Sequence, residues 1–261
     1  MRVNLSIVSH GHFEIIKKIG SLEKLCGKEW VSICVVDNLC EYGFEEWCNE
    51  LGINYLKNKT KCGFGENNNK AFNFFYKNEC GCESFFLVVN PDVLVLPEQL
   101  EKLYNFVRNE NIDFACINLF KDNNLSVYDN SIRKYPSLTD FLTSFIFSKN
   151  KTIIDKSTIF EPITVDWASG SFLLFKPSLY KKLYGFDERY FMYCEDIDIC
   201  MRANFICGSK LVYIPSITAI HYAAHNNRKI LSKHFFWHMK SMLRYLYRKN
   251  YIILKNKISK K

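Results

Sequence analysis

Residues 85–92 read Phe-Phe-Leu-Val-Val-Asn-Pro-Asp, an apolar run that passes directly into a carboxylate. The apolar residues predict a buried strand, and Asn-Pro-Asp predicts a turn after it. Similar short apolar segments lie on both sides and alternate with segments of helical pattern. We expect strands at 3–8, 31–36, 53–56, 85–89 and 113–119, and helices at 13–26, 43–50, 66–78 and 97–109. This alternation predicts an α/β fold, a mostly parallel sheet with helices on both faces and ligands at the carboxyl ends of the strands.

The second half of the chain continues this pattern less regularly. Residues 120–165 are polar, with one helix expected near 137–147, and residues 171–175 predict another apolar strand. A helix is expected from Glu195 to about Ile206, and a long amphipathic helix from about Leu231 to Asn250. We therefore divide the chain into an α/β domain, 1–230, and a basic amphipathic helical segment, 231–261.

The composition is that of a folded globular protein. Hydrophobic residues make up 48% of the 261 residues, enough for a core. No apolar run approaches the ~20 residues that span a bilayer, and the first ten residues predict a strand rather than a signal peptide. The eleven cysteines, an odd number, are expected to be reduced thiols, and Cys80-Gly81-Cys82 is weak support for a metal site. We expect a cytoplasmic protein, free or peripheral to the membrane.

The charge is unevenly placed along the chain. Residues 199–261 hold 13 Lys and Arg and no Asp or Glu, whereas residues 1–198 have a net charge of −5. In the last helix Lys240, Arg244 and Arg248 are spaced to share one face, among apolar and aromatic neighbours. Such a helix favours an anionic membrane surface. The alternative is a helix that packs its apolar side on the body and solvates its charges.

An acidic cluster follows a turn and an aromatic run in residues 185–202, which begin Gly-Phe-Asp. Glu195, Asp196 and Asp198 stand at the expected start of a helix, where free N–H groups and the helix dipole stabilise carboxylates. One carboxylate held there, beside an aromatic wall, can act as a general base. The alternative is helix capping, with Asp198 and Arg202 forming an i,i+4 pair.

Two motifs near the N-terminus are candidates for contact with a nucleotide. Asp37-Asn38 follows the second strand, where a carboxylate can bind a base or ribose, although both residue types also form turns. Residues 63–70, Gly-Phe-Gly-Glu-Asn-Asn-Asn-Lys, precede a helix whose start could attract phosphate, although an ordinary capped helix start explains them as well.

Other candidates come from the centre and the end of the chain. Asp92 supplies a hard oxygen ligand suited to a divalent cation, or it belongs to a Pro-Asp turn. Trp167 stands beside small residues, as in a sugar pocket or in an ordinary core. His221 and His225 follow a predicted strand and are either metal ligands or packed histidines.

In order, these segments are strand-Asp-Asn, Gly-Phe-Gly-x-x-x-Asn, Asn-Pro-Asp, Trp-x-x-Gly-Ser, Gly-Phe-Asp, Glu-Asp-x-Asp and His. The set resembles the inverting nucleotide-sugar glycosyltransferases of family 2, which have the GT-A (Rossmann-like) fold. The stretches 9–12, 190–198, 219–223 and 237–246 resemble the bacterial O-antigen rhamnosyltransferases. That resemblance implies transfer of L-rhamnose from dTDP-β-L-rhamnose to GlcNAc-diphosphate-polyprenol, with inversion to an alpha-3 linkage, in lipopolysaccharide biosynthesis.

The resemblance also implies a role for each matching residue. Asp196 would be the catalytic base, and Asp92 and His221 would bind a divalent cation, Mg²⁺ or Mn²⁺. Asn90 stands where many relatives have Asp. Donor contacts would come from Ser9, Asp37, Asn38, Gly63, Gly65, Asn69, Asn90, Asp92 and Arg202, and acceptor contacts from Trp167, Gly170 and Glu195.

The implied partners are a nucleotide-sugar donor, a polyprenyl-diphosphate-linked sugar acceptor and the anionic inner face of the cell membrane, with no nucleic acid. Transfer of galactofuranose, glucose or an N-acetylhexosamine by the same fold remains an alternative. So does a non-catalytic protein that binds a nucleotide sugar or a nucleic acid.

Overall fold

The computed structural model describes residues 1–77, 84–147, 150–223 and 233–258. Cys80, Cys82 and His225 lie outside the described residues, as does the proposed domain boundary between residues 230 and 231. The division into two parts therefore stays a prediction.

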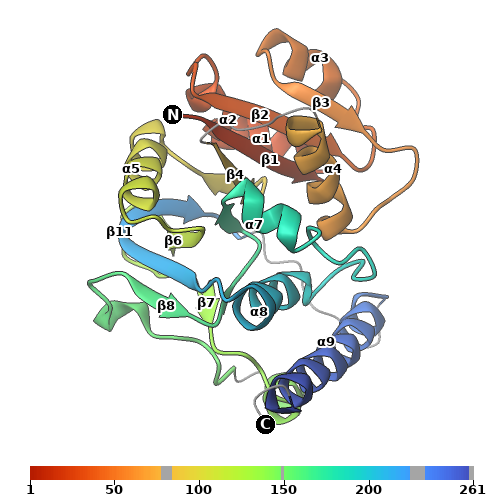
Figure 1. Ribbon diagram of the computed structural model, residues 1–261. Coiled ribbons are helices and arrows are strands. Elements are labelled where there is room, and N and C mark those ends of the chain that lie inside the picture. The colour runs from red at the N-terminus through yellow and green to blue at the C-terminus, as the bar shows by residue number, and fades with distance from the viewer. Residues whose placement is uncertain (78–83, 148–149, 224–232, 259–261) are drawn as a thin grey trace.

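The core of the fold is a central sheet with both parallel and antiparallel strands (Figure 1). Its strands lie in the order β3 (Asn54–Lys57), β2 (Val31–Asp37), β1 (Val3–Ser9), β4 (Phe85–Val89), β10 (Phe172–Phe175), β6 (Phe114–Phe120), β11 (Leu211–His221) and β5 (Val93–Leu94). The first four are parallel, and so are β6 and β11, but β10 runs antiparallel to both of its neighbours. The prediction of a mostly parallel sheet is confirmed, with an antiparallel strand inserted at its centre. Two further pairings complete the strands: β8 (Ile163–Val165) joins β11, and β7 (Ile132–Arg133) pairs with β9 (Trp167–Ala168).

Helices cover both faces of this sheet. On one face lie α1 (Phe13–Ile19), α2 (Ser21–Leu25), α3 (Phe44–Glu50) and α5 (Pro97–Asn109); on the other lie α4 (Phe64–Tyr76), α6 (Leu138–Phe147), α7 (Pro177–Lys182), α8 (Glu195–Cys207) and α9 (Lys233–Ile258). A short 3₁₀ helix, η1, spans Lys156–Thr158. Strand β4 shows how the two cores form, because Phe86 and Val88 pack into one and Phe85, Leu87 and Val89 into the other.

The helix expected at 13–26 is the clearest error in the predicted elements. It is broken into α1 and α2 at Gly20, whose φ of 64° lies in the left-handed region. Glycine adopts this conformation without a steric penalty, and its N–H closes α1 on the carbonyl of Ile16. The local apolar pattern continues across the break, so periodicity alone predicts one helix.

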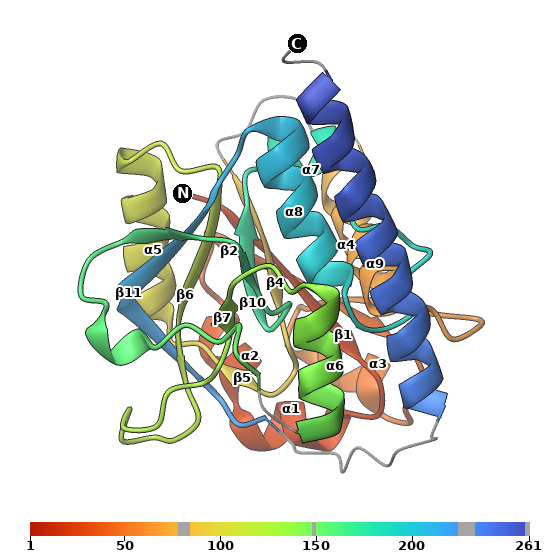
Figure 2. The same ribbon diagram turned by 90° about the horizontal axis from the view of Figure 1, so that it is seen from below.

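Helix α9 lies along α8 at the edge of the molecule (Figure 2). Its inner side packs on the body, with Met242, Tyr245 and Ile252 buried. This is the packing alternative expected from the sequence, but Arg248 is not left in solvent. Its guanidinium forms ion pairs with Asp198 at 2.8 Å and Asp187 at 2.5 Å.

Candidate active site

The carboxyl ends of β1 and β2 lie side by side and place Ser9 opposite Asp37. Asp37 is fully buried, and its carboxylate accepts hydrogen bonds from the backbone N–H groups of Leu39, Cys40 and Glu41 and from the Tyr55 hydroxyl. Ser9 donates to Glu41, 2.5 Å away. The structure thus brings these two predicted donor residues together at the expected edge, and their side chains organise the loops that follow the strands.

Asn38 ties the end of β2 to the segment before α4. Its amide nitrogen donates to the carbonyl of Cys62, and its amide oxygen accepts from Asn58 and from the N–H of Cys62. It is a buried crosslink between two loops. A direct contact of Asn38 with a donor stays a prediction.

The glycines before α4 are explained by packing. A Cβ atom on Gly63 would lie 2.7 Å from the carbonyl oxygen of Phe191, and one on Gly65 would lie 2.6 Å from the Cβ of Phe186. Asn69, one turn further along α4, donates to the Phe186 carbonyl and accepts from the Phe186 N–H. These three residues therefore hold the loop that precedes α8, and their predicted contact with phosphates stays untested.

Asp92 and His221 meet at the end of β4. The short strand β5 pairs with the end of β11, which sets His221 opposite Val93 and next to Asp92. The distance from His221 Nε2 to Asp92 Oδ1 is 3.3 Å. Asn90 supports the turn, because its carbonyl accepts from Val93 and its N–H donates to Ser171. The two predicted metal ligands are thus neighbours, although 129 positions separate them in the sequence.

Asp129 completes this group, and the sequence analysis missed it. Its Oδ2 lies 2.6 Å from His221 Nδ1. Burial lowers the pKa of His221, but hydrogen bonds with Asp129 and Asp92 and their charges outweigh burial and raise it to about 9. Burial raises the pKa of Asp129, and the hydrogen bond and charge of His221, with buried Lys156 nearby, lower it overall. The negative charges of Asp92 and Asp129 are therefore balanced by positive charge on His221 and on nearby Lys156.

The donor set of this cluster fits a divalent cation. Within the described ranges no three His, Cys, Asp or Glu side chains converge on one point, so the protein would supply two ligands, Asp92 Oδ1 and His221 Nε2. Mg²⁺ commonly takes one or two protein ligands and completes its shell with phosphate oxygens and water. Asp129 holds the opposite ring nitrogen, as carboxylates do behind metal-binding histidines.

Glu195 and Asp196 open α8 after two residues, Tyr193 and Cys194, with φ of 72° and 64°. Such backbone is rare outside glycine and turns the chain sharply into the helix. Asp196 accepts from its neighbour Ile197 N–H at 2.8 Å and from Gly170 N–H at 3.3 Å. The predicted catalytic base thus lies beside one predicted acceptor residue.

Glu195 is buried, and Asp196 is partly buried. Burial raises the pKa of Asp196, and burial together with the charge of Asp196 raises the pKa of Glu195. The Oε2 atom of Glu195 is buried and has no hydrogen-bond partner in the described part of the chain. At Asp196 the nearby positive charge of Arg133 opposes part of this rise in pKa.

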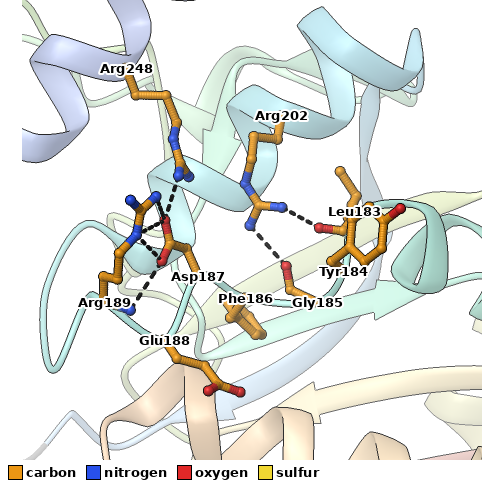
Figure 3. A pocket seen from close by; sticks show the side chains of 9 residues that line it. All are labelled: Leu183, Tyr184, Gly185, Phe186, Asp187, Glu188, Arg189, Arg202 and Arg248. Atoms are coloured by element: carbon orange, nitrogen blue, oxygen red, sulfur yellow. Dashed lines mark hydrogen bonds and ion pairs between the residues drawn. The ribbon is translucent and has the colours of Figure 1, made fainter.

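Trp167 and Arg202 lie in packed surroundings. The indole N–H of Trp167 donates to the Lys134 carbonyl, and Trp167 is 6% exposed. Arg202 pairs with Asp198 at 2.7 Å, the expected i,i+4 pair, and donates to the carbonyls of Leu183 and Gly185 (Figure 3). Its contacts are structural, and its predicted role in donor binding gains no support from them.

A surface pocket of about 420 Å³ lies beside Arg202 (Figure 3). It is lined by the segment Leu183–Arg189 together with Arg202 and Arg248. Arg202 is the one predicted site residue in its lining, and the carboxylates Asp92 and Asp196 do not line it. The pocket therefore does not coincide with the predicted catalytic and metal-binding carboxylates.

The sequence matches a known family and several curated proteins. The family Glycosyl transferase family 2 matches residues 15–182. Over 257 residues the chain is 40% identical to the rhamnosyltransferase WbbL of Escherichia coli (strain K12), covering 97% of this chain and 96% of that protein. It is 32% identical over 198 residues to the N-acetylglucosaminyl-diphospho-decaprenol L-rhamnosyltransferase of Mycobacterium tuberculosis (strain ATCC 25618 / H37Rv), covering 73% of this chain and 62% of that protein.

Solved structures share the fold at low sequence identity. GalNAc-T7 with UDP, GalNAc and Mn²⁺ has a TM-score of 0.64 at 12% identity, over 94% of this chain and 47% of that one. The mannosyltransferase PcManGT from Pyrobaculum calidifontis, in complex with GDP-Man and Mn²⁺, has a TM-score of 0.55 at 14% identity, over 87% and 58%. The predicted fold class is confirmed. From the match over residues 15–182 and the identity to WbbL along nearly the whole chain, we conclude that this protein is a glycosyltransferase that belongs to family 2.

Proposed function

We propose that the protein transfers L-rhamnose from dTDP-β-L-rhamnose to GlcNAc-diphosphate-polyprenol, forming an alpha-3 linkage, during synthesis of O-antigen or a related surface polysaccharide. The observation that carries this proposal is the 40% identity to a rhamnosyltransferase over 97% of the chain. The acceptor class is supported by the name of the mycobacterial relative, which acts on N-acetylglucosaminyl-diphospho-decaprenol.

Asp196 is the proposed general base. The acceptor hydroxyl attacks the anomeric carbon on the face opposite the diphosphate. The new C–O bond forms as the bond to the diphosphate oxygen breaks, dTDP leaves with the electron pair, and the hydroxyl proton passes to the Asp196 carboxylate. Displacement in one step inverts the anomeric centre. Two backbone N–H groups hold this carboxylate in place, and its raised pKa favours proton uptake.

Asp92 and His221 are the proposed ligands of a divalent cation, Mg²⁺ or Mn²⁺. When bound, the cation would supply positive charge to the departing diphosphate. Asp129 keeps the His221 ring oriented through its contact with Nδ1. The proposal is supported by the donor set and by the Mn²⁺ bound in two solved structures with the same fold.

The proposed place of action is the inner face of the cell membrane, where a polyprenyl-linked acceptor lies. None of the described helices is both long and apolar enough to cross a membrane. We therefore propose peripheral association.

A product assay tests the function directly. The protein is mixed with Mg²⁺, dTDP-β-L-rhamnose and a synthetic GlcNAc-diphosphate lipid, and the mass of the lipid product is measured by mass spectrometry. A gain of one deoxyhexose is expected, and Asp196→Asn serves as the inactive control. Transfer of a different sugar from a panel of nucleotide sugars, with none from dTDP-rhamnose, would replace the donor in this proposal.

A further inference from the structure

The outward face of α9 carries large apolar side chains. We define the outer stripe as Phe236, Leu243, Tyr247, Tyr251 and Leu254, which are 57–77% exposed. Phe236, Leu243, Tyr247 and Leu254 follow one another at intervals of seven, four and seven residues. At 3.6 residues per turn these intervals place the side chains on one side of the helix. The stripe is therefore a continuous surface rather than scattered exposed residues.

Among the described residues, the stripe does not contribute to the packing of the core. The opposite side of α9 provides the packing, through buried Met242, Tyr245 and Ile252 and the ion pairs of Arg248. A helix that is apolar on the packed side and apolar again on the solvent side has a second surface to cover.

The charge of α9 indicates what covers it. The helix contains no Asp or Glu, and Lys240 and Lys255 lie exposed at the borders of the stripe. Two copies of α9 packed stripe to stripe would bring cations of both copies together without an acidic partner from the helix. An anionic lipid leaflet complements the same pattern, because it accepts apolar side chains below its headgroups and attracts lysine.

The inner side of α9 also reaches the loop in front of the catalytic carboxylates. Trp237 packs on Phe191 with ring centroids 4.7 Å apart, and His238 stacks on Tyr193 at 4.8 Å. The Ser241 hydroxyl donates to the Met192 carbonyl. The loop 189–194 leads directly to Glu195 and Asp196, so one helix carries the outer stripe and also packs on the loop before the predicted acceptor residues.

We propose that the outer stripe of α9 lies in the interface of an anionic membrane and holds the acceptor side of the active site against it. The membrane contact deepens the proposed function, because it rests on a lipid-linked acceptor. It assigns the contact to the apolar stripe with Lys240 and Lys255 at its borders, and not to a basic face that includes Arg244 and Arg248. Arg248 is occupied by Asp187 and Asp198, and Arg244 donates to the carbonyl of Arg189.

Vesicle binding by matched variants tests this assignment. The full-length protein is sedimented with vesicles of phosphatidylglycerol and phosphatidylcholine. Replacing Leu243 and Leu254 together by Glu should weaken binding ~10–100-fold, because two apolar anchors are lost and two negative charges added. Phe160→Glu is the matched control, since Phe160 is 80% exposed, between η1 and β8. It should bind as the parent protein does.

Activity separates this inference from the proposed function. With a water-soluble short-chain GlcNAc-diphosphate acceptor the double variant should work as the parent protein does, and with acceptor embedded in vesicles it should lose rate in step with binding. Equal vesicle binding by parent and double variant would overturn the inference. A second result would also overturn it: the parent protein is a dimer, the double variant is a monomer, and the two bind vesicles equally. The stripe would then pack against a second copy of the chain. Stripe-dependent vesicle binding by a protein inactive on both acceptors would support the inference and reject the rhamnosyl proposal.

Discussion

The two acidic centres of this protein place carboxyl groups in opposite electrostatic environments. At the end of β4, Asp92 and Asp129 flank His221, and each negative charge has a partner. At the start of α8, Glu195 is buried and the adjacent Asp196 is partly buried, and the pKa values of both carboxyl groups are raised. A carboxylate paired with a cation keeps its charge, whereas a buried carboxylate beside another tends to take up a proton. The first centre is suited to holding a charged group and the second to accepting a proton, as their environments dictate.

The largest effect should come from removing the proton acceptor. Asp196→Asn should lower the rate of transfer ~10²–10⁴-fold, because the amide cannot take the hydroxyl proton. Donor affinity, measured by calorimetry with Mg²⁺ and dTDP-rhamnose, should be unchanged. Exposed Glu161→Gln is the control. If Asp196→Asn remained active, Asp196 would not be the proton acceptor, and the proposed difference between the two centres would be wrong.

The next effect concerns the partner of His221. Asp129→Asn should weaken Mn²⁺ binding ~10–100-fold, because loss of a carboxylate behind a ligating imidazole frees the ring and lowers its basicity. Binding is measured by electron paramagnetic resonance of free Mn²⁺, with no substrate present. Asp92→Asn should weaken it at least as much. Unchanged affinity in Asp129→Asn would show that the contact with Nδ1 does not position the ligand.

The charge of His221 predicts a pH dependence of similar or smaller size. With its pKa raised to about 9, the imidazole is protonated at neutral pH in the metal-free protein, and a cation must displace that proton. Mn²⁺ affinity should therefore rise with pH by up to about tenfold per unit below that pKa. Titration calorimetry in buffers of different ionisation enthalpy should also detect the released proton. A flat affinity between pH 6 and 9 would exclude this competition.

The smallest effect is on stability and concerns Glu195. Its pKa is raised in the folded protein, so the folded state holds its proton more tightly than the unfolded state does. Its stabilising contribution is complete below the ordinary carboxyl pKa and is lost as pH rises through the raised one. Glu195→Gln removes this dependence, so the variant should gain stability relative to the parent protein as pH rises. Urea unfolding at several pH values measures it, and a constant difference between the two proteins would contradict the raised pKa.

Local sequence patterns predict those helices and strands well whose apolar spacing and end signals lie within the element itself. The expected helix at 97–109 matches α5 residue for residue, because Pro97 starts it and Leu100, Leu103, Tyr104 and Val107 form its buried face. The start of α8 was likewise predicted at Glu195. The antiparallel direction of β10 was not, because strand direction depends on the path of the chain and leaves no trace in an apolar run.

The sequence identified candidate site residues more successfully than it identified the residues that they contact. Asp92 and His221 were named together through a resemblance, and the structure places them 3.3 Å apart. Asp129 was missed because it lies in an irregular polar segment, and its contact with His221 spans 92 positions. Asn69 and Gly65 were predicted to contact the donor, whereas the structure shows them in contact with Phe186, which is far along the chain. A local motif shows that a residue matters without showing what it touches.

The order of synthesis gives the contacts of α9 a further consequence. Domains generally fold from the N-terminal side as the chain emerges. The strands that carry Ser9, Asp37 and Asp92 can assemble early, whereas the loop 189–194 receives Trp237, His238 and Ser241 only when α9, the last described helix, has been made. The loop in front of the proposed general base is therefore the last part of the described site to receive its packing partners. Folding of α9 brings the outer stripe and this loop into place together.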